Sequence, residues 1–240
     1  MRKALLLSCI AAAALLTGCI KETFLITNDQ TMGNIIDGRF LSDQGIWYDV
    51  TDEVNPGDTK KLLSESRALV LCDILQNTTV SGGEMSYNIL LKEFVHVDVA
   101  PVVTEVPQEE APVLVDLVWA SGAYLNFRLI YLTPETPKQE HSFSVVVEKA
   151  PTDLQEMVLH IYHNAGGEYY GALLGGGESD KTTYKQQVAF VSVLILPYYQ
   201  SDTAINTHYT VKYAWHKKAE DGRTYLPATE IYEESGKLGY

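Results

Sequence analysis

Apolar side chains recur at every second position along much of the second half of the chain. The clearest run places five residues on one face of an extended segment: Ala123, Leu125, Phe127, Leu129 and Tyr131. The same period returns within residues 143–147, 157–161 and 209–215. Since successive side chains of a strand point to opposite faces of a sheet, this period predicts half-buried β-strands. Residues 188–196 are apolar on both faces, which predicts a central strand covered on both sides.

Shorter strand patterns fill the first half of the chain. Residues 38–42 and 46–50 are two β-rich runs, separated by a turn triplet that ends in Gly45. Longer apolar runs follow at 67–75 and 87–99, and a polar segment that contains glycine joins them. The sequence therefore predicts an all-β protein. The seven or more short strands of its second half predict an antiparallel sandwich.

A change in composition divides the chain into two parts. Residues 100–112 contain three prolines and three glutamates, which is typical of a stiff, exposed linker. We therefore predict one β domain over residues 37–99 and a second over residues 113–240. Residues 19–36 show no sustained alternation and carry polar side chains, which predicts a tether ahead of the first domain.

The N-terminus has the three-part pattern of a secretory signal peptide. Two basic residues follow Met1, an apolar and small-residue run covers residues 4–16, and small residues then lead to Cys19. The run is shorter than the roughly 20 residues of a transmembrane helix, so residues 1–18 are predicted to be a cleaved leader. Residues 16–19, Leu-Thr-Gly-Cys, match the lipobox of bacterial lipoproteins. We expect lipid on Cys19, and two or three acyl chains there would anchor the protein firmly to a membrane.

Cysteine usage and net charge narrow the possible partners. Cys9 leaves with the leader and Cys19 carries lipid, so Cys72 alone remains and no intramolecular disulfide can form. Cys72 lies in an apolar run, where a buried thiol is expected. The chain has 18 basic and 31 acidic residues, a formal net charge of −13. This acidity disfavours nucleic-acid binding and electrostatic attachment to membranes, so no nucleic-acid partner is expected.

Two motifs suggest ligand chemistry, but their details argue against it. The glycine-rich segment 171–178 resembles a phosphate-binding loop, yet Glu178 stands where that loop requires lysine. We interpret the segment as a hairpin loop. His160 and His163 are three residues apart, which on a strand directs their side chains to opposite faces. We therefore predict neither a metal site nor a cofactor.

No catalytic constellation stands out. The sequence lacks a Gly-x-Ser-x-Gly motif, and its paired acids at 52–53, 109–110 and 233–234 would diverge on extended chain. Tyrosine pairs such as 169–170 could stack on sugars, but tyrosine suits β cores and strand surfaces equally well. Asp202-Thr203-Ala204 matches a short O-glycosylation signal of the form Asp-Ser/Thr-aliphatic.

Three stretches of the sequence resemble the NigD-like lipoproteins of Bacteroidetes. Residues 66–71 are similar to the family's Gln-Arg-Val strand, and residues 115–126 to the tryptophan-glycine-tyrosine-leucine opening of its C-terminal domain. Residues 159–167 resemble its Arg-His-Asn-Ala-x-Gly-Asp turn. The resemblance marks four motif residues: Arg67, Trp119, His163 and Asn164.

This resemblance implies an N-terminal OB-like barrel followed by a C-terminal immunoglobulin-like β-sandwich. It also implies association with a bacteriocin locus, and it brings no catalytic residues. Tyr162 stands where the family tends to carry arginine, and Gly167 where aspartate is usual, so the roles of those polar residues do not transfer. An OB-like barrel does not by itself imply nucleic-acid binding.

These observations together predict a non-enzymatic lipoprotein of the cell envelope. We expect it in the outer membrane, attached through Cys19, with an unidentified envelope protein or glycan as its partner. Lys21-Glu22 resembles the signal that directs Bacteroidetes lipoproteins to the surface. Two alternatives stay open: a fimbrillin-like structural subunit, which also combines a lipobox with β-sandwiches, and a glycoside hydrolase that depends on clustered carboxylates.

Overall fold

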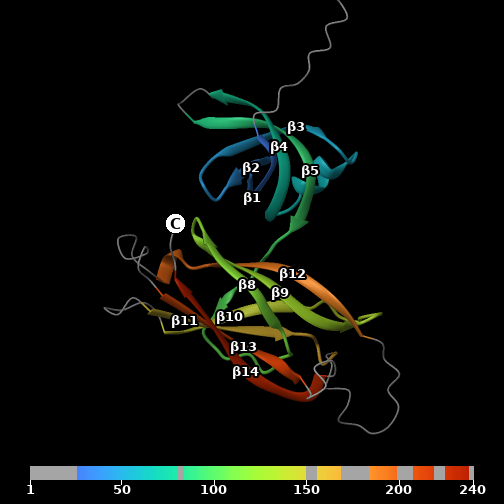
Figure 1. Cartoon of the computed structure of the whole chain (residues 1–240), viewed down its shortest axis with the longest axis vertical. Coiled ribbons are helices and arrows are strands. Elements are labelled where there is room, and N and C mark those ends of the chain that lie inside the picture. The colour runs from blue at the N-terminus through green and yellow to red at the C-terminus, as the bar shows by residue number, and fades with distance from the viewer. Residues whose placement is uncertain are drawn as a thin grey trace, which may run out of the picture.

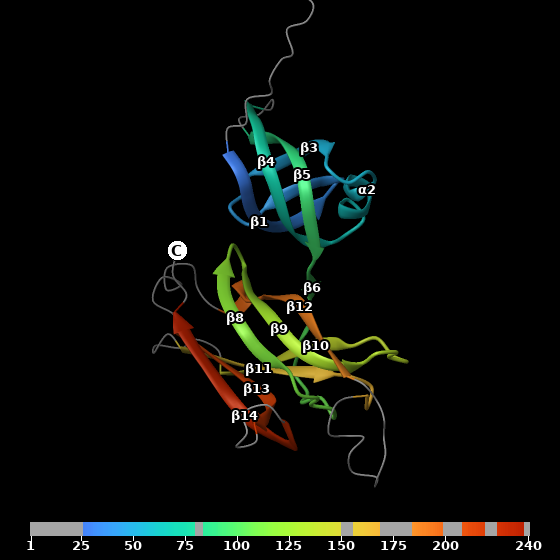
Figure 2. The same cartoon turned by 45° about the vertical axis from the view of Figure 1, so that its right-hand side comes forward.

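The computed structural model describes residues 26–79, 84–149, 156–168, 184–198, 208–218 and 225–237. These residues form strands almost throughout, with one short α-helix and one 3-10 turn, which confirms the all-β prediction. Figures 1 and 2 show a barrel at one end of the long axis and a two-sheet module at the other. In the described part of the chain, no helix is long and apolar enough to cross a membrane.

The barrel consists of five strands and one short helix. Their bounds are β1 (Ile26–Ile36), β2 (Arg39–Ser42), β3 (Trp47–Glu53), α2 (Asp58–Leu62), β4 (Arg67–Thr79) and β5 (Met85–His96). The strand order is β1-β2-β3-β5-β4, and the barrel closes because β1 pairs with both β2 and β4. The barrel core contains Phe40, Tyr48, Leu62, Ala68, Val70, Cys72, Ile74, Ile89 and Leu91. Cys72 is buried, as predicted, and burial raises the pKa of its thiol to about 12.

The predicted tether over residues 19–36 is wrong for its larger part, because residues 26–36 form β1. The sequence of this strand lacks a clear alternation because both faces of its central part are covered. Thr31, Met32 and Gly33 are all buried in succession, since β1 lines the barrel on one face and meets the two-sheet module on the other. A side chain at Gly33 would collide with the backbone of Leu41 on β2, so glycine permits this close pairing.

The two-sheet module encloses one apolar core. One sheet has the order β14-β13-β11-β10-β7 and the other β6-β12-β9-β8. The bounds are β6 (Asp98–Val99), β7 (Val102–Val103), β8 (Leu114–Ser121), β9 (Tyr124–Pro134), β10 (Ser142–Lys149), β11 (Glu156–Asn164), β12 (Tyr184–Leu194), β13 (His208–Lys218) and β14 (Tyr225–Lys237). Core residues include Leu125, Phe127 and Leu129 from one sheet and Val145, Leu159, Ile161 and Val211 from the other. The alternating runs predicted from the sequence thus face a shared interior.

The segment that joins the two modules is partly built into the sheets. The sequence predicted an exposed linker over residues 100–112, whereas β7 pairs in parallel with β10 inside that range. Just before it, β6 pairs in parallel with β12, and the amide of Ala100 donates to the carbonyl of Ser192 at 2.9 Å. Edge pairing of this kind can hold a segment as short as two residues, which leaves no alternation to detect in the sequence.

The prediction that residues 188–196 form a central strand covered on both faces is only partly correct. Strand β12 does lie inside its sheet, between β6 and β9. Both of its faces are buried at Val191, Ser192 and Val193, but Val188 is 50% exposed. The double coverage is local because the barrel covers the outer face of the sheet around Ser192 and leaves the rest open.

Candidate functional site

A buried arginine joins the barrel to the two-sheet module. Arg67 is the first residue of β4, and its side chain is fully inaccessible to solvent. Its Nη1 and Nη2 atoms donate to the two carboxylate oxygens of Asp43 at 2.8 and 2.6 Å, and the Asp43 side chain is only 2% exposed. Nη1 also donates to Asn34 Oδ1 at 3.1 Å. The guanidinium therefore has a bidentate carboxylate partner within its own module, the strongest hydrogen-bonding arrangement that arginine makes.

The same guanidinium reaches across to the other module. Arg67 Nε donates to Ser192 Oγ at 2.8 Å, and Nη2 donates to Asn126 Oδ1 at 3.2 Å. The guanidinium carbon also lies 3.9 Å from the centre of the Tyr124 ring, within range of a cation–π interaction. All three nitrogens are thus in use, as a buried charge requires if its lost hydration is to be offset.

The polar partners of Arg67 also bind one another. Ser192 Oγ donates to Asn126 Oδ1 at 2.7 Å, and Asn126 Nδ2 donates to Ser121 Oγ at 2.8 Å. The Ser121 hydroxyl in turn donates to Asp43, which closes the circuit. We call this set of seven residues the joint: Asn34, Asp43, Arg67, Ser121, Tyr124, Asn126 and Ser192. Because every member has a partner, the joint fixes the two modules in one relative orientation.

A groove opens beside the joint, between the barrel and the outer face of the sheet. Strand register aligns one row of side chains across β8, β9 and β12: Trp119, Asn126 and Ser192. Asn126 and Ser192 of this row belong to the joint. The next row on the same face lines the groove: Leu117, Arg128 and Phe190. The barrel side contributes five residues: Gln30, Thr31, Met32, Gln44 and Leu69. The groove therefore runs across the strands of the sheet and encloses about 460 Å³.

The two walls of the groove differ in chemistry. Trp119 and Phe190 pack edge to face with centroids 6.5 Å apart, and Leu117 beside them is 50% exposed. Arg128 forms an ion pair with Asp116 at the rim, so its charge is locally balanced. Apolar surface with a few convergent polar groups is the usual composition of a small-ligand site, and interfaces between modules are a common place for one.

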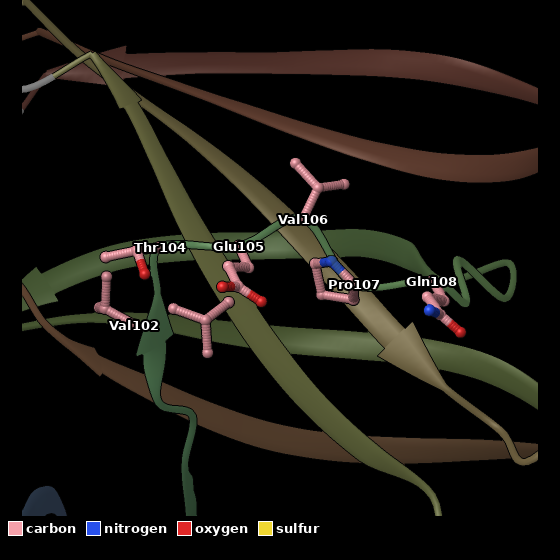
Figure 3. A pocket seen from close by; sticks show the side chains of 7 residues that line it. Val102, Thr104, Glu105, Val106, Pro107 and Gln108 are labelled. Atoms are coloured by element: carbon pink, nitrogen blue, oxygen red, sulfur yellow. The ribbon is translucent and has the colours of Figure 1, made fainter.

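A second hollow lies along β7 and the residues that follow it. Figure 3 shows it, lined by the consecutive residues 102–108. Its volume, about 550 Å³, exceeds that of the groove, but all of its lining comes from one stretch of chain. Val106 points away from the others and is 66% exposed. A site that fixes a ligand needs walls from several elements, so the groove between the modules is the stronger candidate.

A separate cluster surrounds His163 on β11. This side chain is fully buried, stacks on Phe143, and places Nδ1 3.1 Å from the carbonyl of Pro112. Its other ring nitrogen, Nε2, lies 2.9 Å from His141 Nδ1. Desolvation by burial lowers the pKa of His163 to about 4, so its imidazole is neutral at pH 7. The neutral ring then acts as a core residue.

His160 lies on the opposite face of β11, as the spacing predicted. Its ring nitrogens contact Glu110 at 2.6 Å and Glu148 at 3.3 Å, while Leu159 and Ile161 face the core. Among the described residues, no group of three or more His, Cys, Asp or Glu side chains is arranged to hold a metal ion.

A second polar contact between the modules is exposed to solvent. His96, the last residue of β5, places Nδ1 2.6 Å from Glu65 of the barrel and Nε2 3.0 Å from Asp98 of β6. We call these three residues the His96 strap. Because both carboxylates can only accept, the imidazole makes both hydrogen bonds only when doubly protonated. Its pKa is raised: desolvation opposes this shift, but the bonds to Asp98 and Glu65 outweigh it.

The four motif residues fall into two groups. Arg67 and Trp119 meet around Asn126, whose side chain bonds both the Arg67 guanidinium and the Trp119 carbonyl. Asn164, by contrast, follows buried His163 and accepts a hydrogen bond from the Gly166 amide, which shapes the turn after β11. Cys19, residues 171–178 and residues 202–204 lie outside the described part of the chain.

Of the seven residues of the joint, sequence reasoning marked Arg67 alone, and three of the other six illustrate why they were missed. Asn126 stands on the polar side of an alternating strand and looks like a solvent-facing residue. Asp43 belongs to a turn triplet, and Ser192 interrupts an apolar strand. The interruption at Ser192 was the available signal, because a single hydroxyl in a strand that is apolar on both faces requires a buried partner.

The fold defines a class of two-module, all-β proteins, and solved structures share it. A protein of unknown function, DUF1344, from Bacteroides vulgatus is 16% identical, with 89% of this chain and 92% of that chain covered and a TM-score of 0.53. A protein described as a candidate lipoprotein from Bacteroides fragilis is 11% identical, with 86% and 97% covered and a TM-score of 0.50. A NigD-like immunity protein from Bacteroides caccae is 15% identical, with 88% and 97% covered and a TM-score of 0.48.

Solved structures that match this chain therefore include the NigD-like type that its motifs resemble. Identities this low show the fold alone. None of these three proteins carries the name of an enzyme. No protein-family model matches the chain, and no curated protein sequence matches it.

Proposed function

We propose that this chain is a non-enzymatic lipoprotein of the cell envelope that binds its partner in the groove between the two modules. Lipid on Cys19 would anchor it in the outer membrane, with the two modules at the cell surface. The groove carries this proposal, because its walls come from two modules that the joint around the fully buried Arg67 side chain holds in place. A site fixed in this way loses little entropy when a ligand enters.

The joint offers no catalytic alternative. Its two serines are Ser121 and Ser192, and their partners within the joint are Asp43, Asn126 and Arg67. A serine nucleophile requires a base such as histidine to take its proton, and no histidine belongs to this network. The carboxylate of Asp43 is occupied by Arg67. This arrangement supports a structural role for the joint.

We further propose that the barrel is OB-like and the two-sheet module immunoglobulin-like. The closed strand order β1-β2-β3-β5-β4, with a helix between β3 and β4, supports the first assignment. Two facing sheets around a shared core support the second. A link to a bacteriocin locus rests on the motif resemblance alone.

Membrane attachment is tested by substitution of the acylation site. Cys19→Ala should lose metabolic labelling with palmitate and move from the membrane fraction to the soluble fraction. The control is Cys72→Ala, which removes the buried thiol and should keep both label and membrane location. Unchanged labelling of Cys19→Ala would refute the anchor.

Partner binding is tested by photo-crosslinking in intact cells. A photoreactive residue at Leu117, in the groove, should form a discrete adduct, whereas one at Val54, which is 56% exposed on the barrel, should not. Equal adducts at the two positions would refute the groove as the binding surface.

A further inference from the structure

One wall of the groove is mainly apolar and the other carries two amide side chains, and we propose that the groove binds a neutral saccharide. This inference rests on the proposed function and deepens it, because it names the chemical class of the ligand. A sugar ring has C–H-rich faces and a rim of hydroxyl groups. It therefore fits best between a flat apolar surface and side chains that both donate and accept hydrogen bonds.

The sheet provides the apolar surface. Trp119 and Leu117 on β8 and Phe190 on β12 project from the same face of the sheet, on either side of β9, and the two aromatic rings pack edge to face. Leu117 is half exposed, although a side chain of this size is usually buried. A sugar face laid on this surface would remove apolar area from water and gain dispersion contacts.

The barrel provides the hydrogen-bonding groups. Gln30 and Gln44 line the groove opposite the aromatic residues, and each side chain carries one amide donor group and one acceptor. Thr31 Oγ1 donates to Gln44 Oε1 at 3.3 Å, so the Gln44 NH₂ group still has protons to donate to a ligand. Gln30 makes no hydrogen bond with any described side chain. Sugar hydroxyls both donate and accept, and amides match this requirement better than charged groups do.

Charge balance excludes anionic ligands. Arg128 is the cation of the groove, and Asp116 already pairs with it. The neighbouring Arg67 is buried against Asp43 and cannot turn toward a ligand. The chain as a whole carries a formal charge of −13. A phosphorylated or sulfated glycan would find no uncompensated cation here and would be repelled at long range.

The size and direction of the groove set the length of the ligand. Its volume of about 460 Å³ lies within the roughly 300–1,000 Å³ typical of small-ligand sites. It crosses three adjacent strands, from Leu117 on β8 to Phe190 on β12. A linear oligosaccharide of a few sugar units therefore fits better than a single ring.

Titration of the full-length Cys19→Ser protein with defined oligosaccharides tests the proposal. The probes are maltotriose, cellotriose, mannotriose and chitotriose, with a heparin disaccharide as the anionic comparison, and binding is followed by calorimetry and ligand-detected NMR. We expect at least one neutral trisaccharide to bind at millimolar concentration or below, and the heparin disaccharide not to bind. Absence of binding by all four neutral probes, or binding of the anionic probe alone, would overturn the proposal.

Substitutions then locate the site. Trp119→Ala should weaken binding by about ten-fold or more, or about 1.4 kcal/mol, whereas Trp47→Ala should not. Trp47 is the matched control, because it lies beneath Arg39 on the barrel and does not line the groove. Gln30→Ala changes an exposed side chain and should weaken binding several-fold without any change in the unfolding midpoint. Equal affinity for wild type, Trp119→Ala and Gln30→Ala would place the sugar elsewhere and refute the proposal.

A peptide ligand would also give a distinct outcome. Peptides from an array that bind wild type but not Trp119→Ala, in the absence of any sugar binding, would overturn the saccharide and leave the groove as a protein-binding site. Failure of membrane anchoring is measured separately on Cys19→Ala. The two proposals can therefore fail independently.

Discussion

In the described part of the chain, the joint and the His96 strap are two polar contacts that link the barrel to the two-sheet module, and they differ mainly in their access to water. In the joint, the side chains of Arg67 and Asp43 are 0% and 2% exposed. In the His96 strap, the side chains of His96 and Asp98 are both 52% exposed. Both contacts bring a basic side chain to carboxylates at hydrogen-bonding distance, so pairing alone does not distinguish them.

The comparison shows that burial decides what each contact contributes. An exposed ion pair contributes little because water and salt screen it. A buried pair is costly to form, and the loss of one partner leaves an uncompensated charge in a low-dielectric interior. The joint should therefore respond strongly to substitution and weakly to salt. The strap should respond mainly to pH.

The largest expected effect comes from Arg67→Met, which leaves Asp43 buried without its cation. We expect a loss of about 3–5 kcal/mol in the free energy of unfolding, measured by urea denaturation. The matched control is Arg39→Met, which breaks the partly exposed pair with Asp49 and should cost about 0–1 kcal/mol. The double substitution Arg67→Met with Asp43→Leu should recover part of the loss, because no charge is then left buried. Equal losses for Arg67→Met and Arg39→Met would contradict this account.

Acid should destabilise the two-sheet module through His163. Its pKa is about 4 in the folded protein and about 6.5 in the unfolded chain, so the unfolded state binds more protons between these values. The stability that His163 contributes is present above pH 6.5 and is lost as the pH falls, by about 3 kcal/mol at pH 4. His141, whose pKa is also lowered by burial, acts in the same direction.

Urea denaturation between pH 7 and pH 4 measures this loss. His163→Gln should show a shallower fall in stability than wild type over that range, while substitution of exposed His208 by Gln should leave the fall unchanged. The same pH slope in His163→Gln and wild type would rule out this residue as its source.

The joint also depends on close backbone contact at Gly122, between β8 and β9. Gly122 has φ +54°, and a Cβ atom there would lie 2.9 Å from the carbonyl oxygen of Asp43. Gly122→Ala should therefore cost about 2–3 kcal/mol, from backbone strain together with displacement of Asp43. Gly45→Ala is the control, since φ is +79° but no atom lies within 4 Å, and it should cost only about 1 kcal/mol. Equal costs would show that Asp43 can move without penalty.

The smallest effect belongs to the His96 strap. Because the pKa of His96 is raised in the folded state, its contribution is complete below the unfolded pKa and is lost as pH rises through the folded pKa. This dependence has the opposite sign to that of His163. NMR titration of the His96 ring should give a pKa above 6.5 in wild type and a lower value in Asp98→Asn. Identical values in the two proteins would contradict the proposed contact.

Local patterning predicted most of the architecture, because strand alternation depends on neighbours in sequence. The core face of β9 and the opposite faces of His160 and His163 followed directly from a period of two. The buried thiol of Cys72 followed from its apolar run. Strand β1 was not predicted from the local pattern, because its burial depends on contact with both the barrel interior and the second module.

The candidate site was harder to predict because its residues come from distant segments. Motif resemblance marked Arg67 and Trp119, but nothing in the sequence paired Arg67 with Asp43 or Asn126. Asp43 and Asn126 are ordinary surface residues by local pattern, and only tertiary packing removes them from water. The groove was not predictable for the same reason. Its two walls come from different modules, and neither wall alone has a sequence pattern that marks a binding site.

The position of Arg67 in the chain affects how the protein can be assembled. Asp43 lies 24 residues before it, whereas Ser192 lies 125 residues after it. A chain that emerges from its N-terminus first can complete the ion pair early, while the hydroxyl that caps Nε arrives much later. Until β12 is in place, one side of the guanidinium stays hydrated, and the barrel surface around it remains polar and open. Expulsion of that water is therefore among the last events in assembly. It joins the barrel and the two-sheet module, which are synthesised one after the other, into a single unit.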